Sequence, residues 1–115
     1  MPEITKDGND ILDLIEEMNA RDDYNNEEKI AVLWLLGEDT EKNLDHVVSE
    51  YNRNSKAPEI IRSSSEIQNT IDSVSDEIKS CYKQNMTRKA DRLVYAETLY
   101  EWVLGENDAY DELLN

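Results

Sequence analysis

One stretch of the chain constrains its fold more than any other: every residue from 30 to 36 is apolar, and Gly37 follows directly. A helix that is apolar around its whole circumference normally lies at the centre of a protein. A buried strand gives the same pattern over so few residues, but Asn25 and Glu28 upstream have the spacing of a helix N-cap and its reciprocal partner. The stretch therefore predicts a central helix that ends at Gly37.

The rest of the chain also favours helices. Three Gly and two Pro leave few positions for the tight turns of a β-protein. Ser63 with Glu66 predicts a second reciprocal cap, and Asp39 or Thr40 and Thr87 are the expected caps of two further helices. We therefore predict an all-α fold, a single compact bundle of about five helices plus a short C-terminal helix. The expected ranges are about 9–21, 26–36, 40–51, 63–85, 87–105 and 108–114, within one domain spanning 1–115 in which 1–8 and 52–62 are irregular.

The composition is strongly acidic, since 27 Asp and Glu against 12 Lys and Arg give a formal net charge of −15. High charge with low hydropathy is also typical of disordered chains, but two Trp, six Tyr and periodic apolar stripes favour a folded domain. No window has the apolar length of a membrane span, and the N-terminus has no apolar signal segment. We expect a cytoplasmic protein that does not enter a membrane.

The acidic residues are unevenly placed. Residues 1–50 hold fifteen acids and four bases, residues 51–95 six and eight, and residues 96–115 six and none. Carboxylates repeated every 5 to 6 Å along a helix imitate a phosphate backbone, so a row of them should bind a basic cleft. We expect the first helix and the residues after it to form this acidic face. Its members are Asp10, Asp13, Glu16, Glu17, Asp22, Asp23, Glu27 and Glu28.

These features predict a small acidic binding protein that inhibits a partner by docking on its basic, nucleic-acid-binding surface. Phage counter-defence proteins, antitoxins and nuclease immunity proteins are similar in size and charge, although no family motif accompanies that similarity. The alternative is a homo-oligomeric helical adaptor, such as a homodimer, that uses a narrow apolar seam with heptad spacing along the 63–85 helix. The seam consists of Ile67, Ile71, Val74, Ile78 and Cys81.

Residues that could carry chemistry are few. His46, the only histidine, lies opposite the apolar stripe of its helix, and Asn43 stands where a di-metal Glu-x-x-His motif would need Glu. Cys81 belongs to the apolar seam, which favours a buried thiol, and the acidic stretches lack the spacing of a calcium loop. We therefore expect no enzyme activity, metal or other cofactor.

A run of bases between the two longest predicted helices would have to bind nucleic acid inside a field of −15, so we expect no direct nucleic-acid binding. Pairing with the acidic first helix or the acidic tail, within the chain or between subunits, is the favoured use. The run consists of Lys79, Lys83, Arg88, Lys89 and Arg92.

One short pattern occurs twice: Trp34 and Trp102 are each followed by two aliphatic residues, Gly and Glu. Duplication of a two-helix unit would explain the repeat, and so would two helices that end with the same glycine cap. The second explanation is favoured. Both tryptophans belong to the two most apolar predicted helices, so we expect them to be shielded in the core.

Overall fold

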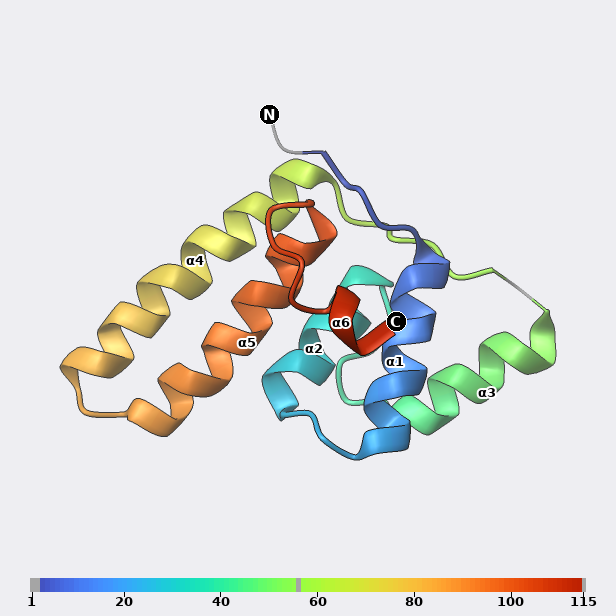
Figure 1. Cartoon of the computed structure of the whole chain (residues 1–115), viewed down its shortest axis with the longest axis horizontal. Coiled ribbons are helices and arrows are strands. Elements are labelled where there is room, and N and C mark those ends of the chain that lie inside the picture. The colour runs from blue at the N-terminus through green and yellow to red at the C-terminus, as the bar shows by residue number, and fades with distance from the viewer. Residues whose placement is uncertain (1–2, 56, 115) are drawn as a thin grey trace.

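The computed structural model describes residues 3–55 and 57–114, and no strand occurs among them (Figure 1). The predicted all-α bundle of five helices with a short C-terminal one is confirmed. Parts of the predicted irregular segments, residues 1, 2 and 56, lie outside the described residues. The helices are α1 (Gly8–Arg21), α2 (Asn26–Leu35), α3 (Leu44–Asn54), α4 (Ser64–Lys83), α5 (Thr87–Val103) and α6 (Asp111–Leu114).

The bundle is arranged around α2 and α5. The two longest helices, α4 and α5, form a hairpin, and α2 packs against α5. The helices α3 and α6 both contact α1, and α6 is also bonded to α5, since the Trp102 indole N–H donates to Asp111. The hairpin extends beyond the other helices, so its turn lies at one end of a molecule that measures 46 × 33 × 28 Å.

Three helices begin with a reciprocal cap. The side chain of the N-cap residue accepts a hydrogen bond from the backbone N–H of the residue three positions later. The side chain of that later residue accepts a hydrogen bond from the backbone N–H of the N-cap residue. Such a cap satisfies N–H groups that a helix start leaves without partners. The caps of α2 and α4 confirm the prediction, whereas α1 begins slightly earlier than expected. The pairs are Asp7 with Asp10, Asn25 with Glu28, and Ser63 with Glu66.

The caps predicted for α3 and α5 are wrong. α3 begins only after Asn43, because Asp39 uses its carboxylate inside the preceding turn and Thr40 lies in that turn as well. Thr87 is the first residue of α5 rather than its cap; Met86 occupies the cap position, and no side chain of the described residues caps this helix. α3 also continues to residue 54, so the irregular connection begins later than residue 52.

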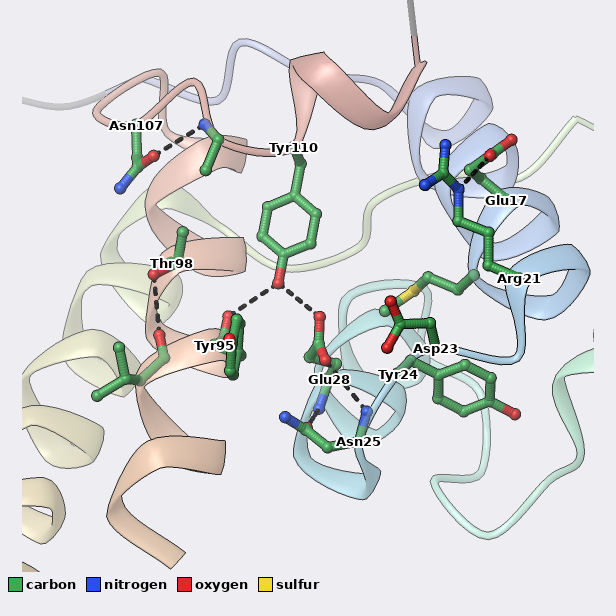
Figure 2. Close-up of a pocket in the computed structure, with 13 residues that line it drawn as sticks. Glu17, Arg21, Asp23, Tyr24, Asn25, Glu28, Tyr95, Thr98, Asn107 and Tyr110 are labelled. Atoms are coloured by element: carbon green, nitrogen blue, oxygen red, sulfur yellow. Dashed lines mark hydrogen bonds and ion pairs between the residues drawn. The ribbon is translucent and has the colours of Figure 1, made fainter. Parts of the chain in front are cut away.

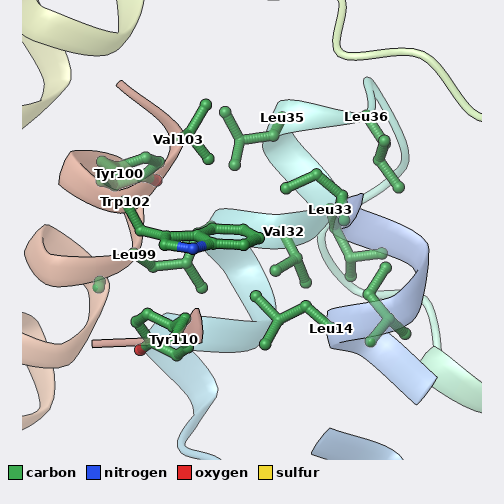
Figure 3. Close-up of a cluster of buried hydrophobic side chains, with 14 of the residues drawn as sticks. Leu14, Val32, Leu33, Leu35, Leu36, Leu99, Tyr100, Trp102, Val103 and Tyr110 are labelled. Atoms are coloured by element: carbon green, nitrogen blue, oxygen red, sulfur yellow. The ribbon is translucent and has the colours of Figure 1, made fainter. Parts of the chain in front are cut away.

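The core lies where α2 and α5 meet. Figure 3 shows Trp102 extending from α5 among leucine and valine side chains, with Tyr110 beside it. Trp102 is 1% exposed, which confirms the expectation for this residue. Trp34 is only half-buried, because it lies at the edge of the core with its ring edge-on to Tyr100 at a centroid distance of 5.7 Å.

The repeated Trp-to-Glu pattern ends α2 and α5 in the same way. Gly37 and Gly105 have φ angles of 72° and 75°, and the N–H of each bonds the carbonyl of the tryptophan three residues before it at 3.1 Å. The N–H of Glu38 and that of Glu106 each bond the carbonyl five residues before. This is the Schellman arrangement, so the shared glycine cap is confirmed.

The similarity extends to the chain segment that crosses each of these helix ends. The N–H of Thr5 donates to the carbonyl of Val103 at 2.8 Å. The N–H of Ile61 donates to the equivalent carbonyl of Leu35 at 3.0 Å. We call the first crossing, by residues 5 and 6, the α5 latch, and the second, by residues 61 and 62, the α2 latch.

Each latch places a cation over the tryptophan of the helix that it crosses. The Nζ of Lys6 lies 4.9 Å from the ring centre of Trp102, and the Cζ of Arg62 lies 4.5 Å from that of Trp34. The Nε of Arg62 also donates to the Trp34 carbonyl at 2.9 Å. Cations over indole rings are attracted by the negative face of the ring. The latches thereby fix the start of α1 on α5 and the start of α4 on α2.

The apolar seam of α4 is used within the chain. Ile67, Ile71, Ile78 and Cys81 are buried and Val74 is half-buried, because α5 packs along this side of α4. The heptad spacing correctly indicated a paired helix, but the pairing partner is α5 of the same chain. A self-association surface made of these five residues is therefore not open in the folded protein.

Candidate functional site

A groove of about 840 Å³ lies between the C-terminal end of α1, the loop 22–25, the exposed face of α5 and the segment 107–110 (Figure 2). Its volume is within the range of sites that bind small ligands or anchoring side chains. Residues 17–28 and residues 94–110, which are far apart in the sequence, meet here. The apolar side chains of its floor are Met18, Tyr24, Val94, Tyr95 and Tyr110.

A buried hydrogen bond fixes one end of the groove. Tyr110 is 5% exposed, and its hydroxyl donates to Oε2 of Glu28 at 2.7 Å, with the Tyr95 carbonyl oxygen 3.1 Å away. The other carboxylate oxygen of Glu28 accepts the N–H of Asn25 at 3.1 Å. Burial, followed by the bond to Glu28 and its charge, raises the pKa of Tyr110. The C-terminal segment is thus tied to the first turn of α2 (Figure 2).

The part of the floor that belongs to α5 exposes two large apolar side chains. Tyr95 is 57% exposed and Val94 is 38% exposed. Thr98, one turn after Val94, bonds its hydroxyl back to the Val94 carbonyl at 2.9 Å, so it offers that proton to its own helix. Single exposed apolar residues are ordinary, but a cluster of them in a concave site marks a surface suited to binding.

The charge of the groove is negative. Its lining includes Glu17, Asp23 and Glu28, and Arg21 is the only cation among its described lining residues. The Nε of Arg21 lies 2.6 Å from Oε1 of Glu17, so this cation is already paired. Asp23 is exposed. A cation brought by a partner would therefore meet uncompensated carboxylate charge.

Of two further carboxylates on α5, Glu101 borders the groove through its interaction with the lining residue Asn107, whereas Glu97 is close enough to Lys79 of α4 to interact with its charge. Glu101 is three residues from Thr98, so the two lie next to each other on the helix surface, and Glu97 is one turn earlier. Burial raises the pKa of Glu97, and burial together with the charges of Glu97 and Glu106 raises that of Glu101. Burial thus disfavours the charged form of both carboxyl groups, and a cation placed beside either of them would favour that charged form and lower its pKa.

The structure divides the predicted acidic face. Asp13, Glu16, Asp22 and Asp23 are exposed, which leaves them open to a partner. They extend from the middle of α1 to the loop that forms one rim of the groove. Asp23 belongs both to this exposed half of the predicted face and to the groove, and we call the two together the α1 surface.

The other four predicted members are occupied inside the chain. Asp10 accepts the N–H of the α1 cap residue at 2.9 Å, Glu17 is paired with Arg21, and an oxygen of Glu27 lies 3.2 Å from the Nε of Arg92. Glu28 is only 8% exposed and serves both the α2 cap and Tyr110. Helix caps and ion pairs engage the same oxygens that a partner would need, so these four residues offer fewer open oxygens than the exposed four, although Glu17 and Glu28 line the groove.

Sequence reasoning missed the apolar half of the site. α5 is apolar around most of its circumference, and this apolar surface exceeds what α2 and α4 cover, so Val94 remains exposed. The sequence signal for an exposed apolar site was therefore that α5 carries more apolar surface than its neighbouring helices can bury. Tyr24, Tyr95 and Tyr110 gave no signal, since they are single aromatic residues in three separate segments.

The other residues that could carry chemistry lie outside the groove. His46 is exposed on α3, and Cys81 is buried between α4 and α5. Within the described part of the chain, no three His, Cys, Asp or Glu side chains are grouped so that they could hold a metal ion. In that same part, every helix is too short or too polar to cross a bilayer.

Comparison of the chain with protein-family models, with curated proteins and with solved structures gives no match. Function therefore has to be argued from the groove and from the charges around it.

Proposed function

We propose that this chain is a small acidic binding protein that inhibits a partner by docking on a basic, nucleic-acid-binding surface of that partner. One observation carries the proposal: the groove joins an open apolar floor to carboxylates, and the one cation in its described lining is already paired. On a chain of charge −15, such a site supplies long-range attraction and a short-range anchor together.

The net charge of the chain and the apolar floor of the groove act at different distances from the partner. The field of the whole chain raises the rate at which a basic surface arrives. At contact, an aliphatic or aromatic side chain of the partner enters the groove beside Val94 and Tyr95, and a neighbouring Lys or Arg lies near Asp23 or Glu101. Arg over the exposed ring of Tyr95 would add a cation–π contact.

Inhibition follows from the surface that is covered. A basic cleft that binds phosphates is attracted to the exposed carboxylates of α1 for the same electrostatic reason. Asp13 and Glu16 lie on α1 before the groove, so a partner anchored in the groove has its adjacent bases near them. While they are paired, those bases are closed to nucleic acid.

The test is a pair of matched charge reversals. A partner is first captured from the native host with the immobilised protein, by comparing what is retained at low and at high salt. The test variant carries Glu16→Lys and Asp23→Lys on the α1 surface; the control carries Asp72→Lys and Asp76→Lys on the exposed side of α4. Both change the net charge equally. We expect the test variant to slow association by about tenfold or more, and the control to slow it much less.

Two results would refute the proposal. Equal effects of the two variants would mean that net charge alone matters and that the α1 surface is not the contact. A partner whose association is indifferent to salt would mean that charge does not guide the encounter, because attraction between exposed charges must weaken with ionic strength.

A further inference from the structure

The free end of the α4–α5 hairpin carries exposed cations, whereas the α1 surface carries exposed carboxylates. Tyr82 is 48% exposed and Met86 is 43% exposed, Lys79, Lys83 and Arg88 near them in the sequence are exposed as well, and the Tyr82 hydroxyl donates to Asp91 at 3.3 Å. Among the described residues, no carboxylate is within ion-pair distance of Lys83 or Arg88. We call this end the basic tip, consisting of Lys79, Tyr82, Lys83, Met86 and Arg88.

Backbone bonds hold the basic tip in one shape. The N–H of Met86 donates to the carbonyl of Cys81 at 2.8 Å, and Asn85 takes a left-handed φ of 59°. Beneath the turn, the two helices share a small core of their own. A rigid scaffold loses little entropy when its exposed side chains dock, so the tip is prepared for binding. The small core consists of Ile78, Cys81, Ala90 and Leu93.

We propose that the basic tip of one copy docks into the groove of a second copy of this chain. Tyr82 and Met86 then contact the apolar floor, and Lys83 and Arg88 lie toward Asp23 and the other carboxylates near the groove. Both components of the contact are complementary, apolar against apolar and positive against negative. A rigid apolar and cationic element is the kind of occupant that the groove fits, and this chain carries one itself.

The occupant must come from another molecule. Met86 occupies the N-cap position of α5 and Tyr95 lies nine positions further on, about 14 Å along the helix axis, and a continuous helix does not fold back on itself. The tip therefore cannot reach the groove of its own chain. A contact of two or three side chains on each side belongs with weak interfaces that bury less than about 1,200 Å². We expect association only at high protein concentration.

The salt dependence distinguishes this contact from the binding of a basic partner. Two copies of charge −15 repel each other. The Debye length is about 10 Å at 0.1 M salt, shorter than every dimension of the molecule, which measures 46 × 33 × 28 Å, but longer than an ion pair. Salt therefore screens the repulsion between the two bodies more than the contact itself. Self-association should strengthen from low to physiological salt, whereas partner binding should weaken.

The test uses sedimentation velocity of the pure protein, so it is independent of any partner and of the proposed function. The tip variant carries Lys83→Glu and Arg88→Glu; the groove variant carries Asp23→Lys and Tyr95→Lys. Each alone should stay monomeric at concentrations where the wild type associates. An equal mixture should associate again, because the intact groove of the first variant meets the intact tip of the second.

A control variant with Lys29→Glu and Arg53→Glu has the same net charge as the tip variant and should associate like the wild type. Circular dichroism verifies the fold of each variant, and Tyr95→Ser alone replaces the groove variant if that one is misfolded. The proposal is overturned by a wild type that remains monomeric at about 1 mM. It is also overturned by a mixture that stays monomeric while the wild type associates, or by an equal loss in the control.

Discussion

Replacing Tyr110 by Phe tests the bond that closes one end of the groove. The change removes one hydroxyl group and keeps the ring, whose centroid lies 6.0 Å from that of Trp102. Glu28 then loses the donor at 2.7 Å but stays in a buried position, 8% exposed. Among the described groups, the N–H of Asn25 is the donor that remains to this carboxylate.

The expected loss follows from that arrangement. A hydrogen bond to a charged group contributes about 1.5 to 3 kcal/mol, and a buried carboxylate that loses a donor retains its desolvation cost. The groove is open, so water can approach the carboxylate and replace part of the bond. We therefore expect the free energy of unfolding to fall by about 2 kcal/mol, a large share of the roughly 5 to 15 kcal/mol typical of a domain.

Urea unfolding followed by tryptophan fluorescence measures this loss, with Tyr95→Phe as the matched control. The Tyr95 side chain is 57% exposed, so removing its hydroxyl should change stability by less than about 0.5 kcal/mol. If Tyr110→Phe and Tyr95→Phe have the same unfolding midpoint, the bond to Glu28 does not stabilise the fold, and the account of how the groove is held is wrong.

The pH dependence provides a second check on the same bond. Burial, and then Glu28, raises the pKa of Tyr110. A group whose pKa is raised on folding contributes stability fully below its unfolded pKa, about 10 for tyrosine, and loses it as the pH rises through the folded value. The difference between wild type and Tyr110→Phe should thus stay constant from neutral pH to about 9 and shrink above about 10.

Three further outcomes are expected. Trp102→Ala should cost about 3 to 5 kcal/mol in urea unfolding and Trp34→Ala less, because Trp34 is only half-buried; equal costs would contradict the burial. Burial raises the pKa of Glu97 and of Glu101, so protonation favours the folded state, and the melting temperature should rise as the pH falls from 7 toward about 5; a steady fall would contradict this. Cys81 is 4% exposed, so a thiol reagent should react with it at least about tenfold faster in urea than in buffer.

Most of the helical framework could be predicted because its signals are local. The apolar run 30–36 lies within a few residues of its cap at Asn25, and the cap of α4 is likewise encoded at Ser63 and Glu66. The cap of α3 could not be predicted in this way. Asp39 and Asn43 are both good N-cap residues, and only the turn in the folded chain decides which of them caps the helix.

Pairing partners could not be predicted, because one pattern fits several partners. The seam spacing of α4 indicates that a helix lies against it, but a neighbouring helix and a second copy satisfy the same spacing. The burial of Glu28 could not be predicted from the sequence either. Its place in the α2 cap is local, whereas its burial depends on Tyr110, which is 82 residues away in the sequence. The groove combines residues 17–28 with residues 94–110, so its apolar half left no local pattern.

The two latches connect the fold to the charge of its surface. Lys6 bonds Asp111 at 3.1 Å while lying over Trp102, and the Trp102 indole N–H donates to the same carboxylate oxygen at 2.8 Å. Asp111 directly follows Tyr110, so the α5 latch also holds the segment that closes the groove. Lys6 and Arg62 are two of only twelve bases; Lys6 lies over the buried Trp102 and Arg62 over the half-buried Trp34. Cations that are half-buried against rings of their own chain leave the surface more negative than an even distribution of charges would, and this excess is what a basic surface would meet.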